Sequence, residues 1–344
     1  MGIPKGKTAK AMPSHPNESG SLIASPIDIN WHSGLSIFAS EPFLKEVGDD
    51  YGWLGGTDEA GQLRCVLPYT IVRKPGFRMV RFRVETIAWQ QELPVELEKS
   101  FLNSATKYFR STGADMVIPA NNTALFRTYP NGAIVAPYGT FIKNLHQKEE
   151  ALWGELHSDY RQNVRKAIKS GIHITSGMEY VNSSYSLIAD TLKRSGQSFR
   201  KQAQFNKMIA GLGDNVKVFV ALHRGVIQAC MVCPFSQDTA YDWYSGTISK
   251  SLRGSMHMLV WEAIRQFSEI GVKRFNFTGV RINPEKGSKQ EGIRNFKMRF
   301  GGDLVEGYIW KYPFRRLKFA AYSAAAYLLM RGNVVKFRAS SEVG

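Results

Sequence analysis

The sequence predicts an α/β protein built from two similar domains in tandem. A strand–turn–strand pattern occurs twice, at residues 51–69 and 216–235, and each copy ends in a proline followed by an aromatic residue. Each copy is followed by a further strand and then by a long amphipathic helix, at 95–113 and at 255–271. Such spaced self-similarity is typical of a duplicated unit. Two unrelated α/β segments that share a common pattern are the alternative.

Glycines mark corresponding points of the two halves. The turn glycines Gly61 and Gly225 are 164 residues apart, and the glycines that end the two helices, Gly113 and Gly271, are 158 apart. A glycine directly after a helix favours a left-handed C-cap. A short apolar strand follows each helix, ADMVIP in the first half and VKRFNF in the second.

Composition restricts the classes of protein. The 344 residues suffice for two domains, and the 43% of hydrophobic residues are enough for a packed core. Collagen, a coiled-coil rod and a disulfide-rich mini-protein are excluded. Lysine and arginine outnumber acidic residues 45 to 29, which gives a formal charge of +16. This charge favours anionic partners: phosphates, nucleic acid, nucleotide-like cofactors or a membrane surface.

Cysteine and histidine give no sign of a metal or redox centre. Cys230 and Cys233 form a CxxC within an apolar run, and Cys65 is the third cysteine. Positions three apart on a strand point to opposite faces, so we interpret this pair as packing residues of a reduced protein. The seven histidines show no metal-ligand spacing. No metal is expected.

The domain boundaries follow from changes in composition. We expect a flexible polar tail over 1–22, an N-terminal domain over 23–146, a C-terminal domain over 147–312 and a basic amphipathic helix and tail over 313–344. No apolar run approaches the ~20 residues of a spanning helix, so we expect a cytoplasmic protein. The uncharged run 319–330, with basic flanks, either docks on the second domain or lies at an anionic membrane surface.

A single long helix is predicted over 149–171. An apolar stripe recurs at helical spacing through Trp153, Leu156, Tyr160, Val164 and Ile168. A basic stripe of Arg161, Arg165 and Lys169, with Lys166 beside it, runs next to the apolar one. Arginine binds phosphate or carboxylate in a bidentate manner, so this stripe is either a substrate contact or a solvated helix face.

Two later segments combine glycine turns with basic residues. In 241–264 an aromatic strand leads through Arg253, Gly254 and Ser255 into a helix, and backbone amides at such a helix start bind anions. In 276–302 a glycine-rich loop over 279–292 connects a strand to a helix, as functional loops do. Lys297 is expected near buried aromatic residues of that helix rather than in water.

These segments together resemble a known family. The motifs are RQNVRKAIKSGI (161–172), YDWYSGT (241–247), GSMHMLVWEAIRQFSEIGVKRFNFTG (254–279) and GIRNFKMRFGG (292–302). In order and spacing they resemble the FemABX peptidoglycan-bridge aminoacyltransferases and their relatives in the GNAT superfamily. The specific part covers about 145–312, and APYGTFI (136–142) resembles the family's segment that leads into the second domain.

The resemblance implies two tandem GNAT-like domains, each a mixed sheet flanked by helices, with a substrate cleft between them. It implies transfer of an acyl or aminoacyl group to an amine of a muropeptide or amino sugar, which can be lipid-linked. No cofactor is expected to be tightly bound, and the co-substrate is aminoacyl-tRNA or acyl-CoA. The chain lacks a clear R/Q-x-x-G-x-G/A run and an inserted coiled-coil hairpin. These departures put CoA dependence and one mode of tRNA contact in doubt.

Roles for individual residues follow from the same resemblance and from their chemistry. Lys297 corresponds to the family's lysine that stabilises the oxyanion, and Asp242 or a water held by Tyr244 is the expected base. The expected donor-binding residues are Arg253, Gly254, Ser255, His257, Thr278 and Gly279, and the expected substrate-binding residues are Arg161, Arg165, Lys166, Tyr138 and Phe296.

Two other functions fit the sequence. One is an acetyl-CoA-dependent sugar N-acetyltransferase of polysaccharide biosynthesis, which needs the turn at 253–257 to hold pyrophosphate. The other is a non-catalytic basic protein that binds RNA or a membrane surface, which the charge of +16 favours. The glycine-rich, aromatic-backed loop at 279–292 argues against a purely solvated binding face.

Overall fold

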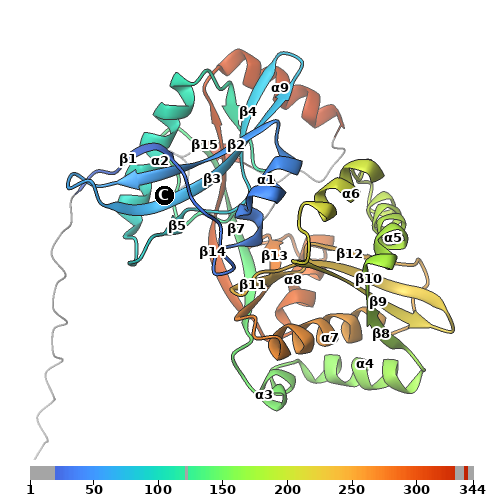
Figure 1. The fold of residues 1–344 in the computed structure, drawn as a ribbon. Coiled ribbons are helices and arrows are strands. Elements are labelled where there is room, and N and C mark those ends of the chain that lie inside the picture. The colour runs from blue at the N-terminus through green and yellow to red at the C-terminus, as the bar shows by residue number, and fades with distance from the viewer. Residues whose placement is uncertain (1–19, 121–122, 330–336, 340–344) are drawn as a thin grey trace, which may run out of the picture.

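The computed structural model describes residues 20–120, 123–329 and 337–339. The predicted α/β fold with two halves is confirmed (Figure 1). The first half is the part of the molecule that contains α2 (Val95–Ser111), and the second half is the part that contains α7 (Ser255–Glu269). Of the predicted tail, only residues 20–22 belong to the described part of the chain. Within that part, no helix has the length and apolar character needed to cross a membrane.

Within the described residues, a mixed sheet connects the two halves. Its strand order is β1 (Ile23–Ile27), β2 (Asp50–Thr57), β3 (Leu63–Lys74), β4 (Phe77–Phe82), β6 (Met116–Val117), β14 (Asp303–Pro313), β7 (Ile134–Asn144), β13 (Arg274–Val280) and β11 (Thr239–Tyr241). Two short strands lie off this path: β5 (Ile87–Ala88) pairs with β3, and β15 (Arg338–Ala339) pairs with β7.

A second sheet belongs to the second half alone. Its order is β12 (Tyr244–Thr247), β10 (Val226–Pro234), β9 (Val216–His223) and β8 (His173–Ser176). The remaining helices are α1 (Glu41–Val47), α3 (Glu149–Gly154), α4 (Ser158–Lys169), α5 (Val181–Arg194), α6 (Gln202–Ala210), α8 (Lys289–Met298) and α9 (Arg316–Leu329), with 3₁₀ turns η1 (Ile37–Ala39) and η2 (Met178–Tyr180).

Both predicted hairpins are confirmed. β2 pairs with β3 around Gly61, and β9 pairs with β10 around Gly225. Both glycines have φ of +77°, a left-handed conformation that a residue with a Cβ adopts at a cost. The predicted helices are α2 and α7, and the glycines after them, Gly113 and Gly271, are also left-handed.

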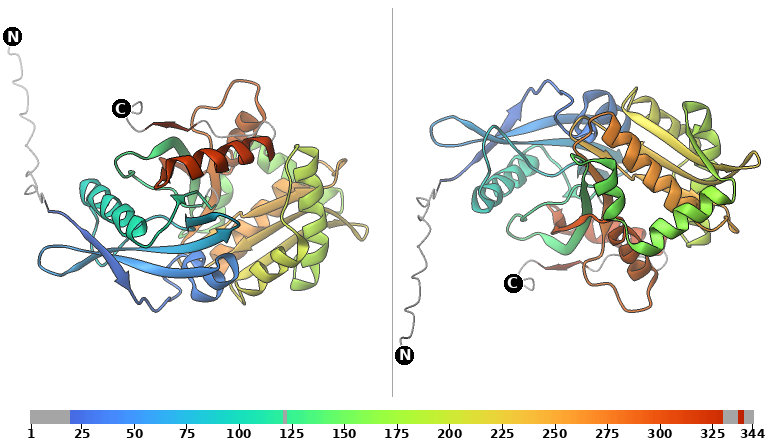
Figure 2. Two further views of the ribbon diagram at one scale, coloured as in Figure 1. Left: turned by 90° about the horizontal axis from the view of Figure 1, so that it is seen from above. Right: turned by 90° about the horizontal axis from the view of Figure 1, so that it is seen from below.

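Helices cover both faces of the second sheet (Figure 2). Side chains of α4 and α7 pack with alternate residues of β9 and β10 in one core cluster, and side chains of α5 and α6 pack with the intervening residues in another. Cys233 lies in the first cluster and Cys230 in the second, both fully buried and free. The interpretation of this CxxC as packing residues on opposite faces is therefore confirmed.

β14 and β7 are the strands that the two halves share. β14 pairs with β7 from Asp303 to Lys311, and its last residues, Tyr312 and Pro313, pair with β6 of the first half. On its other edge, β7 pairs with β13 of the second half, from Gly139 to Asn144. The boundaries predicted from composition, such as the one before residue 147, do not take this shared sheet into account.

The prediction of one continuous helix over 149–171 is wrong. The chain forms α3, breaks, and begins again as α4 after His157, whose Nδ1 accepts a hydrogen bond from the Asp159 amide. Within α4, Tyr160 and Val164 are buried but Ile168, predicted for the core stripe, is 56% exposed, because positions four apart drift around the helix axis and Ala167 takes the inward position instead. A capping histidine is not among the usual N-cap residues, which is why the pattern concealed it.

Candidate active site

Aromatic packing fixes the position of Lys297. The helix α8 begins at Ser288, whose Oγ accepts a hydrogen bond from the Glu291 amide. Phe300, just after the helix, is fully buried and stacks on Phe277 of β13 at 5.6 Å between ring centroids. Phe296 packs edge-on against Phe300 at 5.1 Å. Because these neighbours are held in the core, the lysine between them is held against β13.

The ammonium of Lys297 lies against backbone oxygens of β13. Its Nζ donates to the carbonyl oxygens of Thr278 and Gly279, both at 3.3 Å, and to Thr278 Oγ1 at 3.4 Å. Burial lowers the pKa of Lys297 below its usual value, while the charge of Asp242 acts in the opposite direction. The contacts are long, so the ammonium can turn toward a stronger anionic acceptor.

Thr278, which contacts the Lys297 ammonium, has a strained backbone conformation. Its φ is +58°, which is rare for a β-branched residue. The pairing of β13 with β7 shifts register between Asn276 and Gly279, and the Asn276 side chain accepts a hydrogen bond of 2.7 Å from the Thr278 amide. Such strain costs of order 1–3 kcal/mol and persists mainly at functional sites.

Asp242 lies where one strand changes partners. The Asp242 amide bonds to the carbonyl of Asn276 in β13, whereas the next amide, that of Trp243, bonds to Val232 in β10. The two sheets separate at this step. The Asp242 carboxylate accepts a hydrogen bond from Ser245, and its backbone oxygen accepts one from Thr278 Oγ1 at 3.0 Å. Burial raises the pKa of Asp242, and the Lys297 charge partly offsets this rise.

The structure thus brings together four predicted residues: Lys297, Asp242, Thr278 and Gly279. Tyr244 makes its contacts elsewhere. Its hydroxyl accepts a hydrogen bond of 3.0 Å from Arg200, and its ring packs on Phe199 and Trp243. Its assignment as the holder of a catalytic water remains a prediction, without a contact to Lys297 to support it.

A cluster of arginines beside Tyr244 gives no signal in the sequence. Arg83, directly after β4, lies close enough to Arg81 of β4 and to Arg200 before α6 for both charges to repel its own. Burial and the charges of the other two lower the pKa of Arg83 to about 9. The Nε atoms of all three are buried and have no hydrogen-bond partner among the described residues. Positive charges gathered without an ion pair to a carboxylate among the residues that the structure describes indicate a site for an anion.

The predicted donor turn is closed on one side by α4. Gly254 has φ of +90°, and a Cβ there would lie 2.3 Å from the Asn163 carbonyl oxygen. The Asn163 side chain accepts from Arg253 Nε at 3.0 Å and lies 3.5 Å from His257 Nε2. Burial, followed by the charge of Arg253, lowers the pKa of His257 to about 4, so this ring is neutral at physiological pH. Ser255 is buried and donates to Leu252.

We expect Gly254→Ala to lower the thermal unfolding temperature by several degrees. The new methyl group meets a backbone oxygen of α4, and alanine at positive φ adds roughly 1–2 kcal/mol of strain. The matched control is Gly287→Ala, because Gly287 has φ of +75° with nothing within 4 Å of the added carbon. Equal losses in the two variants would show that strain alone acts and that the contact with α4 is soft.

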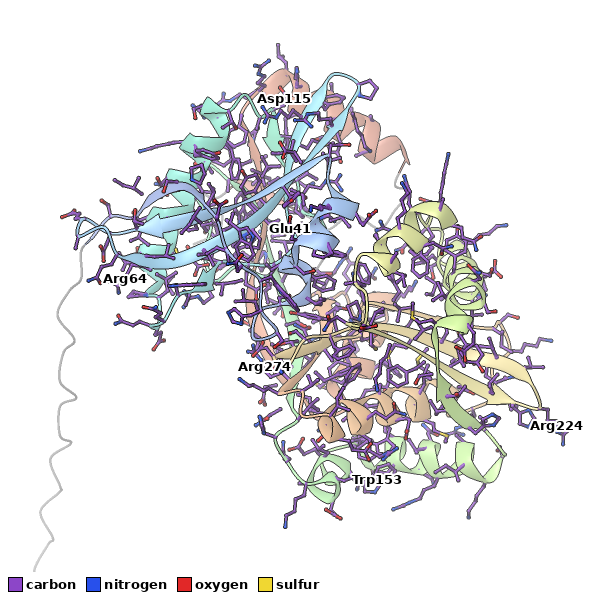
Figure 3. The ribbon with its side chains drawn as sticks, in the orientation of Figure 1. Glu41, Arg64, Asp115, Trp153, Arg224 and Arg274 are labelled. Atoms are coloured by element: carbon purple, nitrogen blue, oxygen red, sulfur yellow. The ribbon has the colours of Figure 1, made fainter. Side chains whose placement is uncertain are left out.

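The basic stripe on α4 divides into different roles. Arg161 donates to the carbonyl oxygens of Gly154 and Leu156 and so closes the end of α3. The guanidinium of Arg165 lies 5.7 Å from the ring of Trp153, and Lys166 is exposed. Figure 3 shows Trp153 on the side of the molecule farthest from the first half. The stripe makes no contact with Lys297 among the described residues, and its substrate role stays a prediction.

The remaining substrate-binding prediction concerns Tyr138 and Phe296. Tyr138 is buried with Ala136 and Ile309, and burial raises the pKa of its hydroxyl. It lies near Arg281, at the start of the loop that precedes α8. Phe296 contacts Tyr160 and His257, at 5.7 and 5.5 Å between ring centroids. Phe296 therefore connects α8 to α4 and α7.

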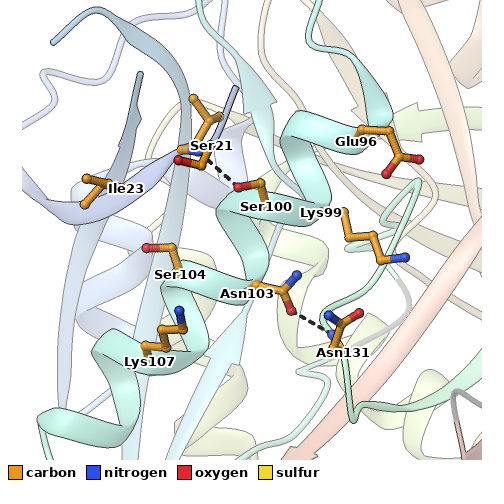
Figure 4. Close-up of a pocket in the computed structure, with 10 residues that line it drawn as sticks. Ser21, Ile23, Glu96, Lys99, Ser100, Asn103, Ser104, Lys107 and Asn131 are labelled. Atoms are coloured by element: carbon orange, nitrogen blue, oxygen red, sulfur yellow. Dashed lines mark hydrogen bonds between the residues drawn. The ribbon is translucent and has the colours of Figure 1, made fainter. Parts of the chain in front are cut away.

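A polar pocket of about 470 Å³ lies on the first half, between α2 and the residues before β1 (Figure 4). Ser100 Oγ accepts from the Leu22 amide at 3.1 Å, and Asn103 Oδ1 accepts from the Asn131 amide at 2.7 Å. The first bond attaches the start of the described chain to α2, and the second attaches the segment before β7 to the same helix. None of the predicted site residues lines this pocket. Among described residues, no group of three or more histidine, cysteine or acidic side chains could hold a metal ion.

Comparison with known proteins confirms the family resemblance. Residues 127–224 match the model of the FemAB family. This segment includes the motifs at 136–142 and 161–172 but ends before those at 241–302, so the role of Lys297 is not part of the match. A search of curated protein sequences finds no significant match.

Solved structures show the fold. A crystal structure of FemX has a TM-score of 0.61 and 13% identity, and the alignment covers 84% of this chain and 93% of FemX. The C-terminal domain of a predicted lysylphosphatidylglycerol synthetase from Agrobacterium fabrum has a TM-score of 0.51 and 14% identity, with 85% of this chain and 92% of that one covered. The present chain therefore spans nearly the whole length of both.

Proposed function

We propose that this FemAB-like chain is an N-acyltransferase that moves an aminoacyl group to an amino group of a cell-envelope precursor, a muropeptide or an amino sugar. The observation that carries the proposal is that Thr278 Oγ1 contacts both Lys297 Nζ, at 3.4 Å, and the backbone oxygen of Asp242, at 3.0 Å, at the step between β11 and β12. A cation and a carboxylate at a break between strands provide an oxyanion partner and a base in one place.

The proposed reaction assigns one task to each group. The acceptor amine attacks the ester carbonyl of the donor and forms a tetrahedral oxyanion. The Lys297 ammonium turns from the Thr278 and Gly279 carbonyls to donate to this oxyanion. Asp242 takes the proton that the amine loses. The C–O ester bond then breaks as the amide forms, and the leaving ribose oxygen takes the proton that Asp242 received from the amine, which returns Asp242 to its ionised form.

The arginine cluster supports an acceptor that carries phosphate. Arg81, Arg83 and Arg200 come from both halves of the molecule and have unpartnered Nε donors. A diphosphate offers several oxygens to three guanidinium groups at once. Envelope precursors linked to a nucleotide or a lipid carry such a group. The name of the Agrobacterium fabrum neighbour also describes aminoacylation of an anionic phospholipid.

The turn before α7 favours aminoacyl-tRNA over acyl-CoA as the donor. A CoA pyrophosphate needs free backbone amides and no opposing negative charge at that turn. Here the carbonyl oxygen of Asn163 faces Gly254 from close range, and the neutral ring of His257 adds no positive charge. A pyrophosphate at this turn would therefore lie near the partial negative charge of the Asn163 carbonyl oxygen, which disfavours it.

Thermal unfolding with candidate donors tests this function, followed by product detection. We expect charged tRNA to raise the unfolding temperature more than uncharged tRNA, and acetyl-CoA to leave it unchanged. A ligand at about 100 times its Kd adds roughly 2.7 kcal/mol of stability. Radiolabelled aminoacyl-tRNA then yields labelled acceptor if the proposal holds. A shift with acetyl-CoA alone would support the sugar N-acetyltransferase instead. Equal shifts with both tRNAs and no product would support a non-catalytic basic protein.

A further inference from the structure

The helix α9 is attached to the first half of the molecule with one fixed face inward (Figures 1 and 2). Asp115 is almost fully buried, and its carboxylate pairs with Arg315 at 3.3 Å and with Lys318 at 3.0 Å. Phe319 and Tyr322 pack on a small core cluster that contains Met79 and Met116. The sequence predicted that this segment docks either on the second domain or on a membrane. The inward face of α9 instead packs against the first half.

The outward face of α9 is apolar and unusually exposed. Leu317 is 88% exposed, more than any other large hydrophobic side chain in the described part of the chain. Four alanines share this exposed surface along the helix: Ala320, Ala321, Ala324 and Ala325. Because the Asp115 contacts fix the rotation of the helix, Leu317 cannot turn inward without breaking them.

The hairpin between β3 and β4 lies beside this helix. The ring of Phe77, near the hairpin tip, meets Tyr322 at 5.9 Å, and the tip residues Lys74 and Pro75 are exposed. Figure 3 shows Asp115 at this end of the molecule, close to both elements. The hairpin tip and α9 therefore form one continuous surface.

The exposed charges of this surface are mainly basic. The segment 71–82 contains four basic residues, of which Arg73 pairs with Asp50 at 3.7 Å and Arg81 belongs to the arginine cluster, and the segment 311–330 contains four more. Arg315 and Lys318 share the single carboxylate of Asp115, which leaves one net positive charge there. Arg316 and Lys74 are exposed beside the apolar face.

We infer that the α9 face and the β3–β4 hairpin tip dock on an anionic lipid bilayer. A 14-residue helix is about 21 Å long, too short to cross a roughly 30 Å hydrocarbon core, but it can lie flat in the interface. Leu317 and the alanines would enter the interface while Arg316 and Lys74 contact lipid phosphates. RNA would leave Leu317 without an apolar partner. A second copy would bring two positive faces together.

Vesicle co-sedimentation tests this docking without any catalytic reaction, so its outcome is separate from that of the proposed function. The probe is large vesicles of phosphatidylcholine with about one third phosphatidylglycerol, compared with phosphatidylcholine alone. We expect the protein to pellet with the anionic vesicles at low salt and to be released as salt rises. Leu317→Glu should lower the partition coefficient at least about tenfold.

The matched control is Val226→Glu, which places the same charge on an exposed apolar residue of the β9–β10 hairpin, 54% exposed in the second half. It should bind vesicles as the unchanged protein does, and neither variant should alter the unfolding temperature. Equal weakening by both substitutions, or no pelleting of the unchanged protein, would overturn the proposal. So would dimerisation without lipid that Leu317→Glu abolishes, because the face would then be covered by a second copy.

Discussion

Replacing Lys297 by alanine is expected to lower kcat by about 10²–10³-fold. This is the typical loss when one donor to a developing oxyanion is removed, about 2.7–4 kcal/mol of transition-state stabilisation. Stability should change little, because the ammonium makes only long contacts to Thr278 and Gly279 and its burial already lowers its pKa. Single-turnover transfer from radiolabelled aminoacyl-tRNA measures the chemical step directly.

Lys289→Ala provides the control for this variant. Lys289 lies on the same helix, α8, but is exposed at its start. The Lys289→Ala substitution removes the same charge from the protein but changes no contact with β13. If both variants retained full activity, Lys297 would have no part in the chemical step. If both lost activity equally, the effect would come from net charge and tRNA attraction.

The pH dependence of the same rate follows from two shifted pKa values. Asp242 acts as a base only when ionised, and burial raises its pKa above the usual 3.8, so the rate rises with pH through that higher value. Lys297 acts only when charged, and burial lowers its pKa below the usual 10.5, so the rate falls again as pH rises through that lower value. The expected profile is a bell narrower than the unshifted pair would give.

Replacing Arg200 by glutamine is expected to raise KM for a phosphate-bearing acceptor about 10- to 100-fold with little change in kcat. One charge-assisted hydrogen bond to phosphate contributes about 1.5–3 kcal/mol. The unfolding temperature should change little, because the loss of the hydrogen bond to Tyr244 is offset by removal of a charge that repels Arg83. An arginine kept only for structure would behave in the opposite way, since its removal would lower stability and leave KM unchanged.

Lys201→Gln is the matched control, because Lys201 is the next residue along the chain and is exposed. It tests whether general electrostatic attraction, rather than the buried cluster, binds the acceptor. A second comparison uses an acceptor without phosphate, for which Arg200→Gln should have no effect on KM. The same increase in KM for both acceptors would exclude phosphate as the group that Arg200 binds.

Local patterns in the sequence were sufficient for much of the fold. Alternating strands with a glycine turn predict β2–β3 and β9–β10, because side-chain period and left-handed turn positions depend on near neighbours. Lys297 was found through the aromatic residues spaced around it in α8 and through family resemblance. The strained φ of Thr278 was not foreseeable, since threonine gives no signal for a positive φ.

The arginine cluster could not be predicted for a different reason. Arg81 and Arg83 are separated from Arg200 by more than a hundred residues, and each has ordinary neighbours in the sequence. Only the packing of the first half against the second brings them together. The break between α3 and α4 could not be predicted because the apolar spacing continues across it. The side chain that closes the end of α3 is Arg161, for which the sequence predicted a substrate contact.

The order in which β7 and β14 leave the ribosome has a consequence for how this protein matures. β7 is synthesised early, but it lies between β13 and β14, and β14 is completed only at Pro313. In the first half, β6 pairs with β4 but lacks its second partner, β14, until that point. The sheet that the two halves share therefore stays incomplete while the chain is still being translated up to residue 302. We expect a nascent chain truncated there to be open to proteases in both halves, and resistance to appear in both at once when the last strand is added.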